Sequence, residues 1–205
     1  MTIPAAEPPP SLRDRQRAQV RADIHDAAYR LFATRGFANV TTDDIAAEAS
    51  VSPRTFFRHV TTKEELLLGS VQRGGSAIAS LLERRPVDEP ADVALAAAIV
   101  SRVSSFDDVE LENWRAAILT APELLDRVTL LAAPDRARLV ELVAERMRAD
   151  PDDDIRPGLM VQLFFAAADF AFQQWVRDRG ERHRTLSSVV AAALAVVAQP
   201  RWRQG

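Results

Sequence analysis

Residues 41–59, TTDDIAAEASVSPRTFFRH, decide the fold of this chain. Good helix-forming residues run from Asp43 to Ala49, and either Thr41 or Thr42 can cap that short helix. Ser52 followed by Pro53 opens a second short helix, because serine caps a helix N-terminus and proline is tolerated at the first helical position. Two short helices joined by about three residues predict a helix-turn-helix.

The apolar and polar residues of this stretch separate into two predicted faces. The buried set that would fix the angle between the helices is Ile45, Ala46, Ala49, Val51 and Phe56. The side chains left facing outward are Arg54, Thr55, Arg58 and His59. Arginine contacts guanine edges or phosphates, and threonine suits a phosphate or a thymine methyl group. The motif therefore predicts that the second helix enters the major groove of DNA.

Helical patterns flank the motif on both sides and continue to the end of the chain. A helix over 11–35 begins at the N-cap Ser11 and stops before Gly36. Thr62 and Glu65 predict a capping box at the start of a helix that reaches about residue 84. The remaining predicted helices cover about 90–104, 107–120, 122–149 with a kink near Pro134, 157–179 and 185–198. The sequence predicts an all-α fold of about nine helices, with no strand.

The domain prediction is a disordered tail over 1–10, a three-helix DNA-binding head over 11–65 and a body over 66–205. Charge supports the division although the whole chain carries −3. Residues 11–63 hold nine basic and six acidic residues, a balance of +3, whereas 76–205 hold sixteen and twenty, a balance of −4. A basic end on an acidic body favours an anionic partner at that end.

Composition excludes several classes of site. The chain has no cysteine and three scattered histidines, so disulfides, a cysteine nucleophile and a metal cluster are not expected. No apolar run reaches the roughly 18 residues that a membrane span needs, and residues 1–10 lack the pattern of a signal peptide. The sequence predicts a cytoplasmic protein that is not an enzyme and needs no cofactor.

The stretch from Gly36 to Leu67 closely resembles the DNA-binding segment of TetR-family regulators, including the Thr-Thr start of the second helix and Lys63-Glu-Glu-Leu-Leu. The resemblance implies a homodimeric, ligand-responsive transcription regulator, usually a repressor. The DNA-contacting positions that it implies are Thr42, Arg54, Thr55, Phe57, Arg58, His59 and Lys63. Phe57 replaces a tyrosine whose hydroxyl binds phosphate, and Ser50 replaces the turn glycine, where a positive φ would be strained. Arginines 13, 15 and 17 either form a solvated face or reach DNA.

The two C-terminal helices predict the dimer interface, because the helix over 157–179 is apolar almost all round and needs two partners. The residues assigned to the interface are Phe164, Ala167, Ala171, Trp175, Leu186, Val190, Ala193, Leu194 and Val197. The residues assigned to a ligand pocket are Phe106, Trp114, Ile118, Leu124, Val128, Phe165, Ala168, Asp169 and Phe172. An acid inside an apolar helix must be paired or hydrated, so Asp169 either pairs with an arginine or binds ligand.

The body also resembles TetR regulators of the mycofactocin-regulator type, on Glu112-Asn-Trp-Arg-Ala and on the long helix with Pro134. That resemblance implies an apolar or acyl-CoA-like effector, with arginines 102, 115, 127 and 136 either at the pocket mouth or merely solvated. The acidic loop 150–154 is either solvated or holds a divalent cation.

Four hypotheses follow, led by a dimeric repressor that an effector releases from a palindromic operator. The second is a helix-turn-helix activator or architectural DNA-binding protein without an effector, which the lack of an enclosed apolar cavity would favour. The third, an enzyme, lacks a nucleophile–base pair. The fourth is a helical protein-interaction module, which the absence of salt-sensitive DNA binding would favour.

Overall fold

The computed structural model describes residues 11–72, 74–131, 133–178 and 184–198, and within them the chain is helical with no strand. The predicted tail over 1–10 lies outside the described residues. The helices are α1 (Leu12–Arg35), the short 3₁₀ helix η1 (Phe37–Asn39), α2 (Thr42–Glu48), α3 (Pro53–His59), α4 (Lys63–Gln72), α5 (Gly74–Glu83), α6 (Ala91–Val103), α7 (Asp108–Ile118), α8 (Pro122–Leu125), α9 (Ala133–Met147), α10 (Arg156–Arg177) and α11 (Leu186–Val197). No described helix has the length and apolar character needed to cross a membrane.

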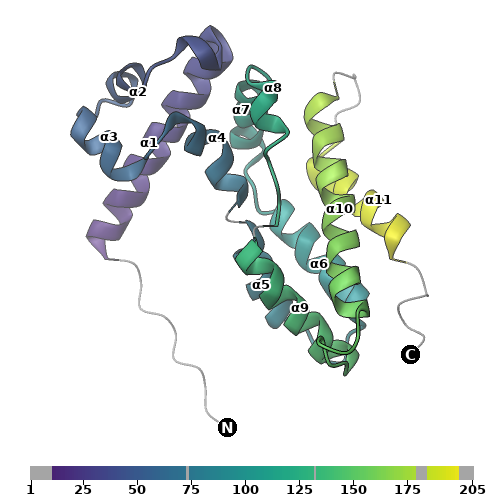
Figure 1. Ribbon diagram of the computed structural model, residues 1–205. Helices are drawn as coiled ribbons and strands as arrows, with labels where there is room; N and C mark the ends of the chain where they lie inside the picture. Colours follow the sequence, from purple (N-terminus) through teal and green to yellow (C-terminus); the bar gives the residue numbers. More distant parts are fainter. Residues whose placement is uncertain (1–10, 73, 132, 179–183, 199–205) are drawn as a thin grey trace.

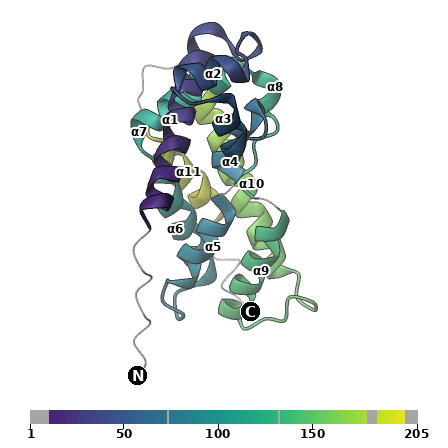
Figure 2. The same cartoon turned by 90° about the vertical axis from the view of Figure 1, so that its left-hand side faces the viewer.

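The all-α prediction is confirmed, and the elements lie in two groups (Figure 1). Helices α1, α2 and α3 form one end of the molecule, whereas α10 and α11 pack against each other at the opposite edge. The view turned by 90° shows α1 to α4 on the near face (Figure 2). The two groups are joined by α4 and by the packing of α1 on α7.

Local side-chain contacts set the helix ends of the head as the sequence predicted. Ser11 accepts a hydrogen bond from the Asp14 amide, and Ser52 accepts one from the Thr55 amide, with Pro53 at the first position of α3. Between the two possible caps of α2, the structure selects Thr41, whose side chain accepts from the Asp44 amide while the Asp44 carboxylate accepts from the Thr41 amide. Thr42 is therefore the first helical residue, and of the two alternatives that the sequence left open the structure has Thr41 as the cap.

Ser50, which replaces the usual turn glycine, nevertheless adopts a positive φ in the turn between α2 and α3. Its φ is 55°, in the left-handed region where a residue with a Cβ costs about 1–2 kcal/mol. The turn stays closed because the Ser50 amide donates to Ala47 O and the Val51 amide donates to Ala46 O. Ile45, Ala46 and Phe56 are buried beneath it, which fixes the angle between the two helices.

Two predicted helices, over 63–84 and 122–149, have different outcomes. The prediction over 63–84 covers α4 and α5, which lie on either side of residue 73, a residue outside the described part of the chain. A Cβ on Gly75 would overlap the Asp135 side chain, so glycine at this position permits close approach of α5 and α9. The prediction over 122–149 became α8 and α9. Pro134 lies in the first turn of α9, where its missing N–H is not needed, and produces no kink.

Candidate functional site

The outer face of α3 is exposed, and its inner face is held by Phe56. Phe56 is fully buried, whereas its neighbour Phe57 is 55% exposed, with the two rings in an edge-to-face contact. Arg54 and Arg58 are exposed, and no ion pair joins either to another described residue. The recognition helix therefore presents two arginines and one phenyl ring outward, as predicted from its pattern.

The remaining predicted contacts on the head are partly engaged within the protein. The Thr55 hydroxyl lies 2.9 Å from the Ser52 hydroxyl, inside the N-terminal cap of α3. The Lys63 ammonium donates to the carbonyls of Phe37 and Val40, at 3.0 and 3.1 Å, and lies over the Phe37 ring. An ammonium has three N–H groups, and Lys63 uses two of them to hold the segment that enters α2. Lys63 therefore positions the helix-turn-helix motif within the protein itself.

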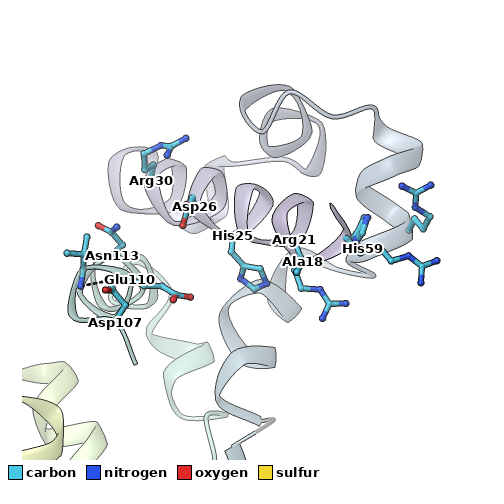
Figure 3. A pocket seen from close by; sticks show the side chains of 13 residues that line it. Ala18, Arg21, His25, Asp26, Arg30, His59, Asp107, Glu110 and Asn113 are labelled. Atoms are coloured by element: carbon cyan, nitrogen blue, oxygen red, sulfur yellow. Dashed lines mark hydrogen bonds between the residues drawn. The ribbon is translucent and has the colours of Figure 1, made fainter. Parts of the chain in front are cut away.

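A basic cluster extends the predicted DNA surface onto α1. An open groove of about 950 Å³ runs between α1, the end of α3 and the start of α7 (Figure 3). Its basic end holds Arg17, Arg21, Arg58 and His59, and we call these four residues the basic cluster. Its other end holds acidic residues of the α7 N-terminus, among them Asp107 and Glu110. Within the described chain no carboxylate pairs with the three arginines of the cluster.

His59 lies where the recognition helix meets these arginines. Its Nε2 atom is buried and has no hydrogen-bond partner among the described residues. Burial lowers the pKa of His59 below its ordinary value, and the positive charges of Arg58, Arg21 and Arg17 lower it further. A phosphate bound beside the three arginines would supply negative charge and so oppose this lowering of the pKa. The sequence analysis did not single out Arg21; the i, i+4 spacing of Arg17 and Arg21 is the signal that could have found it.

A second, apolar cavity lies between α1 and the body, with about 30 Å³ of free space. Its lining residues are Tyr29, Val103, Phe106, Glu110, Leu111, Trp114, Leu130, Phe172, Leu186 and Val190. Phe106, Trp114 and Phe172 were predicted for the ligand pocket. The other predicted pocket residues, Ile118, Leu124, Val128, Phe165, Ala168 and Asp169, do not line this cavity. Five of them are buried in the core instead. The apolar pattern of each helix did not show which apolar side chains pack in the core and which line a cavity.

Asp169 has a partner that the sequence did not predict. Its carboxylate accepts a hydrogen bond of 3.0 Å from the Leu130 amide, in the non-helical segment between α8 and α9. Burial raises the pKa of Asp169, and that hydrogen bond opposes the rise. The expected arginine pair is absent among the described residues. Asp169 thus accepts from a backbone amide that has no helical partner, because Leu130 lies in the non-helical segment between α8 and α9.

The arginines expected at a pocket mouth have other contacts. Arg115 donates to the carbonyls of Val176 and Asp178 and lies over the Trp175 ring. Arg102 lies over the Phe106 ring, 4.1 Å from its centroid. Arg127 and Arg136 are exposed, in agreement with the solvated alternative. In the acidic loop, Asp154 pairs with Arg156 at 2.7 Å, and no cluster of metal-ligating residues occurs in the described part of the chain.

The predicted dimer residues require a correction. Phe164, Ala171, Trp175, Leu186, Val190 and Leu194 are buried within the single chain, so they are unavailable to a partner. Ala167, Ala193 and Val197 are partly buried. The physical reason is the helix register: α10 turns those side chains toward the body and exposes a neighbouring stripe. That stripe holds Leu159, Leu163, Ala166 and Phe170, and on α11 the exposed residues include Ala192, Ala195 and Val196.

Two family models match this chain. Residues 24–69 match bacterial regulatory proteins of the tetR family, and residues 89–201 match the MftR C-terminal domain. The chain belongs to the TetR family. Both resemblances noted in the sequence are thereby confirmed, and the relatives of this TetR-family chain are transcriptional regulators, not enzymes.

The similar proteins cover nearly the whole chain. The HTH-type transcriptional regulator TcmR of Streptomyces glaucescens is 32% identical over 193 residues, which is 90% of this chain and 85% of TcmR. The putative mycofactocin biosynthesis transcriptional regulator MftR of Mycobacterium tuberculosis is 29% identical, with 89% and 91% covered. The structure of the fatty acid degradation regulator FadR from Bacillus halodurans has a TM-score of 0.54 at 20% identity, with 87% of this chain and 94% of FadR covered. The last comparison supports the fold alone.

Proposed function

We propose that this TetR-family chain is a homodimeric repressor that binds a palindromic operator and is released by a small apolar effector. One observation carries the proposal: the exposed face of α3 lies beside a cluster of arginines without carboxylate partners in the described chain. Base contacts come from Arg54 at the start of α3. Phosphate contacts come from the basic cluster and from the backbone amides at the start of α2, near Thr42.

The dimer in this proposal forms through the exposed stripe of α10. Leu159, Leu163, Ala166 and Phe170 follow the 4–3–4 spacing of a helix–helix seam. Phe170 is 65% exposed and Val196 on α11 is 69% exposed, which is unusual for large apolar side chains on adjoining helices. A twofold axis beside this stripe buries the same surface of both subunits and forms a four-helix interface. Two copies of α3 then face two half-sites.

The effector in this proposal binds at the apolar cavity. The cavity lies between α1 of the head and four helices of the body (α6, α7, α10 and α11), so a ligand there can favour one arrangement of head and body over another. A second candidate function is a DNA-binding regulator without an effector. The small free volume of about 30 Å³ is the observation in its favour, because no drug-sized molecule enters without rearrangement.

Selection of duplexes from a randomised pool tests the DNA part of the proposal. The expected result is enrichment of an inverted repeat whose half-sites are separated by about one helical turn or a multiple of it. The Arg54→Ala variant, selected in parallel, should lose preference at one position of each half-site. Failure to enrich any duplex sequence would overturn the proposal. An asymmetric single half-site would overturn its dimeric form.

A further inference from the structure

The open groove and the apolar cavity meet at one residue of α7. The groove lies between α1, the end of α3 and the start of α7, and the cavity lies between α1 and the body. Glu110 is the one described residue that lines both. Its side chain is exposed, whereas seven of the other nine residues that line the cavity are buried. The cavity therefore reaches the open groove at Glu110.

The α1 side of this junction is fixed by hydrogen bonds. His25 lines the groove, and Tyr29, about one turn further along α1, lines the cavity. The Tyr29 hydroxyl donates its one proton to the Leu66 carbonyl at 3.2 Å, so it accepts from His25 Nδ1, which lies 3.1 Å away. The two rings also make an edge-to-face contact. His25 and Tyr29 thus form a wall between groove and cavity that cannot move without breaking these hydrogen bonds.

The α7 side of the junction is held through its backbone. Asp107 caps α7, because its carboxylate accepts from the amides of Val109 and Glu110, each at 3.0 Å. These contacts fix the start of the helix, but no ion pair joins the Glu110 carboxylate to another described residue. Exposed side chains change rotamer within picoseconds to nanoseconds. Glu110 is therefore the part of the junction that can swing aside.

The surface edge of the cavity at Phe106 is covered by a neighbouring side chain. The Arg102 guanidinium lies over the Phe106 ring, 4.1 Å from its centroid, and donates to the Ser105 hydroxyl at 3.0 Å. Opening the cavity on this side would separate a cation from an aromatic ring and break a hydrogen bond. The cavity therefore opens with less disruption at Glu110.

We propose that the effector reaches the cavity through the groove, and that Glu110 is the gate of this route and selects against anions. The inference rests on the proposed function and deepens it. The effector enters the groove between α1 and α7, the Glu110 side chain swings away from the cavity, and the ligand passes the wall formed by His25 and Tyr29. The effector that this route admits is apolar and carries no negative charge.

The charge of the route gives this selection. Asp26, Asp107 and Glu110 line the same groove, and the last two lie across it from α1 in Figure 3. Arg30 also lines the groove but pairs with Glu48 at 3.2 Å. No lysine or arginine of the described chain lines the cavity, so an anion would pass carboxylates and arrive without a compensating cation. This disfavours the acyl-CoA-like class and favours uncharged molecules.

The absence of cysteine from the chain permits a reversible test of the route. Glu110→Cys carries a single thiol, and a methanethiosulfonate reagent attaches a group to it through a disulfide that dithiothreitol removes. The probe is N-phenyl-1-naphthylamine, an uncharged molecule that fluoresces in apolar sites. When the variant is loaded with the probe and then given a benzyl group, stopped-flow fluorescence should show release slowed about tenfold or more. Dithiothreitol should restore the original rate.

Val109→Cys is the matched control, because Val109 is 70% exposed and lines the groove but not the cavity. The same benzyl group there should change the release rate by less than about twofold. Unchanged release from benzylated Glu110→Cys, or loss of the probe when the benzyl group is attached, would overturn the route. Failure of the wild type to bind the probe at all would overturn the effector part of the proposed function as well.

A charged pair of adducts tests the selection. The anionic probe is 8-anilino-1-naphthalenesulfonate, which has the same ring system as the uncharged probe and one added sulfonate. It should associate about tenfold or more faster when Glu110→Cys carries a trimethylammonioethyl group than when it carries a sulfonatoethyl group. Association of the uncharged probe should differ by less than about twofold between the two adducts. Equal rates for the anionic probe on both adducts would overturn the assigned selection.

Discussion

The head and the C-terminal helix pair bury apolar residues in different ways. In the head, short helices with clear caps leave few choices of which side faces inward, and Phe56 is buried while Phe57 is exposed. In α10, apolar residues lie on nearly every side, and the structure buries Phe164 while exposing Phe170. A helix whose residues are mostly apolar therefore needs a defined packing partner on each side. The head has its partners within the chain, whereas α10 leaves one apolar stripe exposed, and we propose that a second copy packs there.

The largest expected effect comes from a charge placed in that stripe. Phe170→Arg should yield a folded monomer, because the side chain is exposed in the single chain but central in the proposed interface. Its DNA affinity should fall about 10²- to 10⁴-fold, since the two heads would no longer bind as a linked pair. Sedimentation gives the mass, and fluorescence anisotropy gives the affinity.

Two variants make this test specific. Val87→Arg, at a residue that is 82% exposed outside the α10–α11 surface, should remain a dimer. Leu194→Ala, at a fully buried residue of α11, should lower the free energy of unfolding by about 2–5 kcal/mol. A Phe170→Arg variant that keeps the dimer mass would refute the proposed interface.

The next effect concerns the extent of the DNA surface on α1. Arg21→Gln should weaken binding to all duplexes alike and reduce the slope of log affinity against log salt by about 0.9 for each lost phosphate contact, roughly 2 per dimer. Arg30→Gln is the matched control, because Arg30 lies on the same helix and borders the same groove but pairs with Glu48 at 3.2 Å. An unchanged salt slope in Arg21→Gln would exclude Arg21 from the DNA surface.

A smaller effect should appear in the pH dependence of DNA binding. Burial and nearby arginines lower the pKa of His59 in the free protein, and a bound phosphate would raise it. Binding would then take up a proton, so affinity should increase as pH falls from about 7 to 5 and decrease as pH rises. The limit is about tenfold per pH unit for each histidine. His59→Gln should flatten the titration; an identical slope in the variant would show that another group takes up the proton.

The lowered pKa has the opposite consequence for folding. A histidine whose pKa is lower in the folded than in the unfolded state reduces stability as pH falls through its ordinary value. The stability of the fold and the affinity for DNA therefore change in opposite directions over the same pH range: as pH falls, stability decreases and affinity increases.

The smallest effect is predicted at the turn of the head. Ser50→Gly should raise the free energy of unfolding by about 0.5–1 kcal/mol, because glycine adopts the observed φ of 55° without a Cβ clash. Urea denaturation measures the difference. Ser52→Gly, at the N-cap of α3, is a matched control that should not stabilise the protein, because it removes the cap hydrogen bond to the Thr55 amide. A loss of stability in Ser50→Gly would show that the serine side chain stabilises the turn.

The sequence predicted the head well because its signals are local. The cap at Ser52 and the exposure of Phe57 each depend on residues a few positions away, whereas the positive φ of Ser50 was not predicted.

The body could not be predicted to the same depth because its signals are long-range. Tyr29 of α1 and Trp114 of α7 both line the cavity. Leu186 and Val190 of α11 also line it, and the sequence had placed these two residues at the dimer interface. Asp169 binds the Leu130 amide 39 positions away instead of an arginine. In each case the partner is brought close by packing between helices, which periodicity along one helix does not specify.

Sedimentation of the wild type with its selected duplex tests the dimer and the effector of the proposed function together. We expect a complex of two chains on one duplex, which dissociates when the uncharged apolar probe N-phenyl-1-naphthylamine saturates the protein. A single chain bound to the duplex with undiminished affinity, or a two-chain complex that stays intact when the probe is bound, would contradict it.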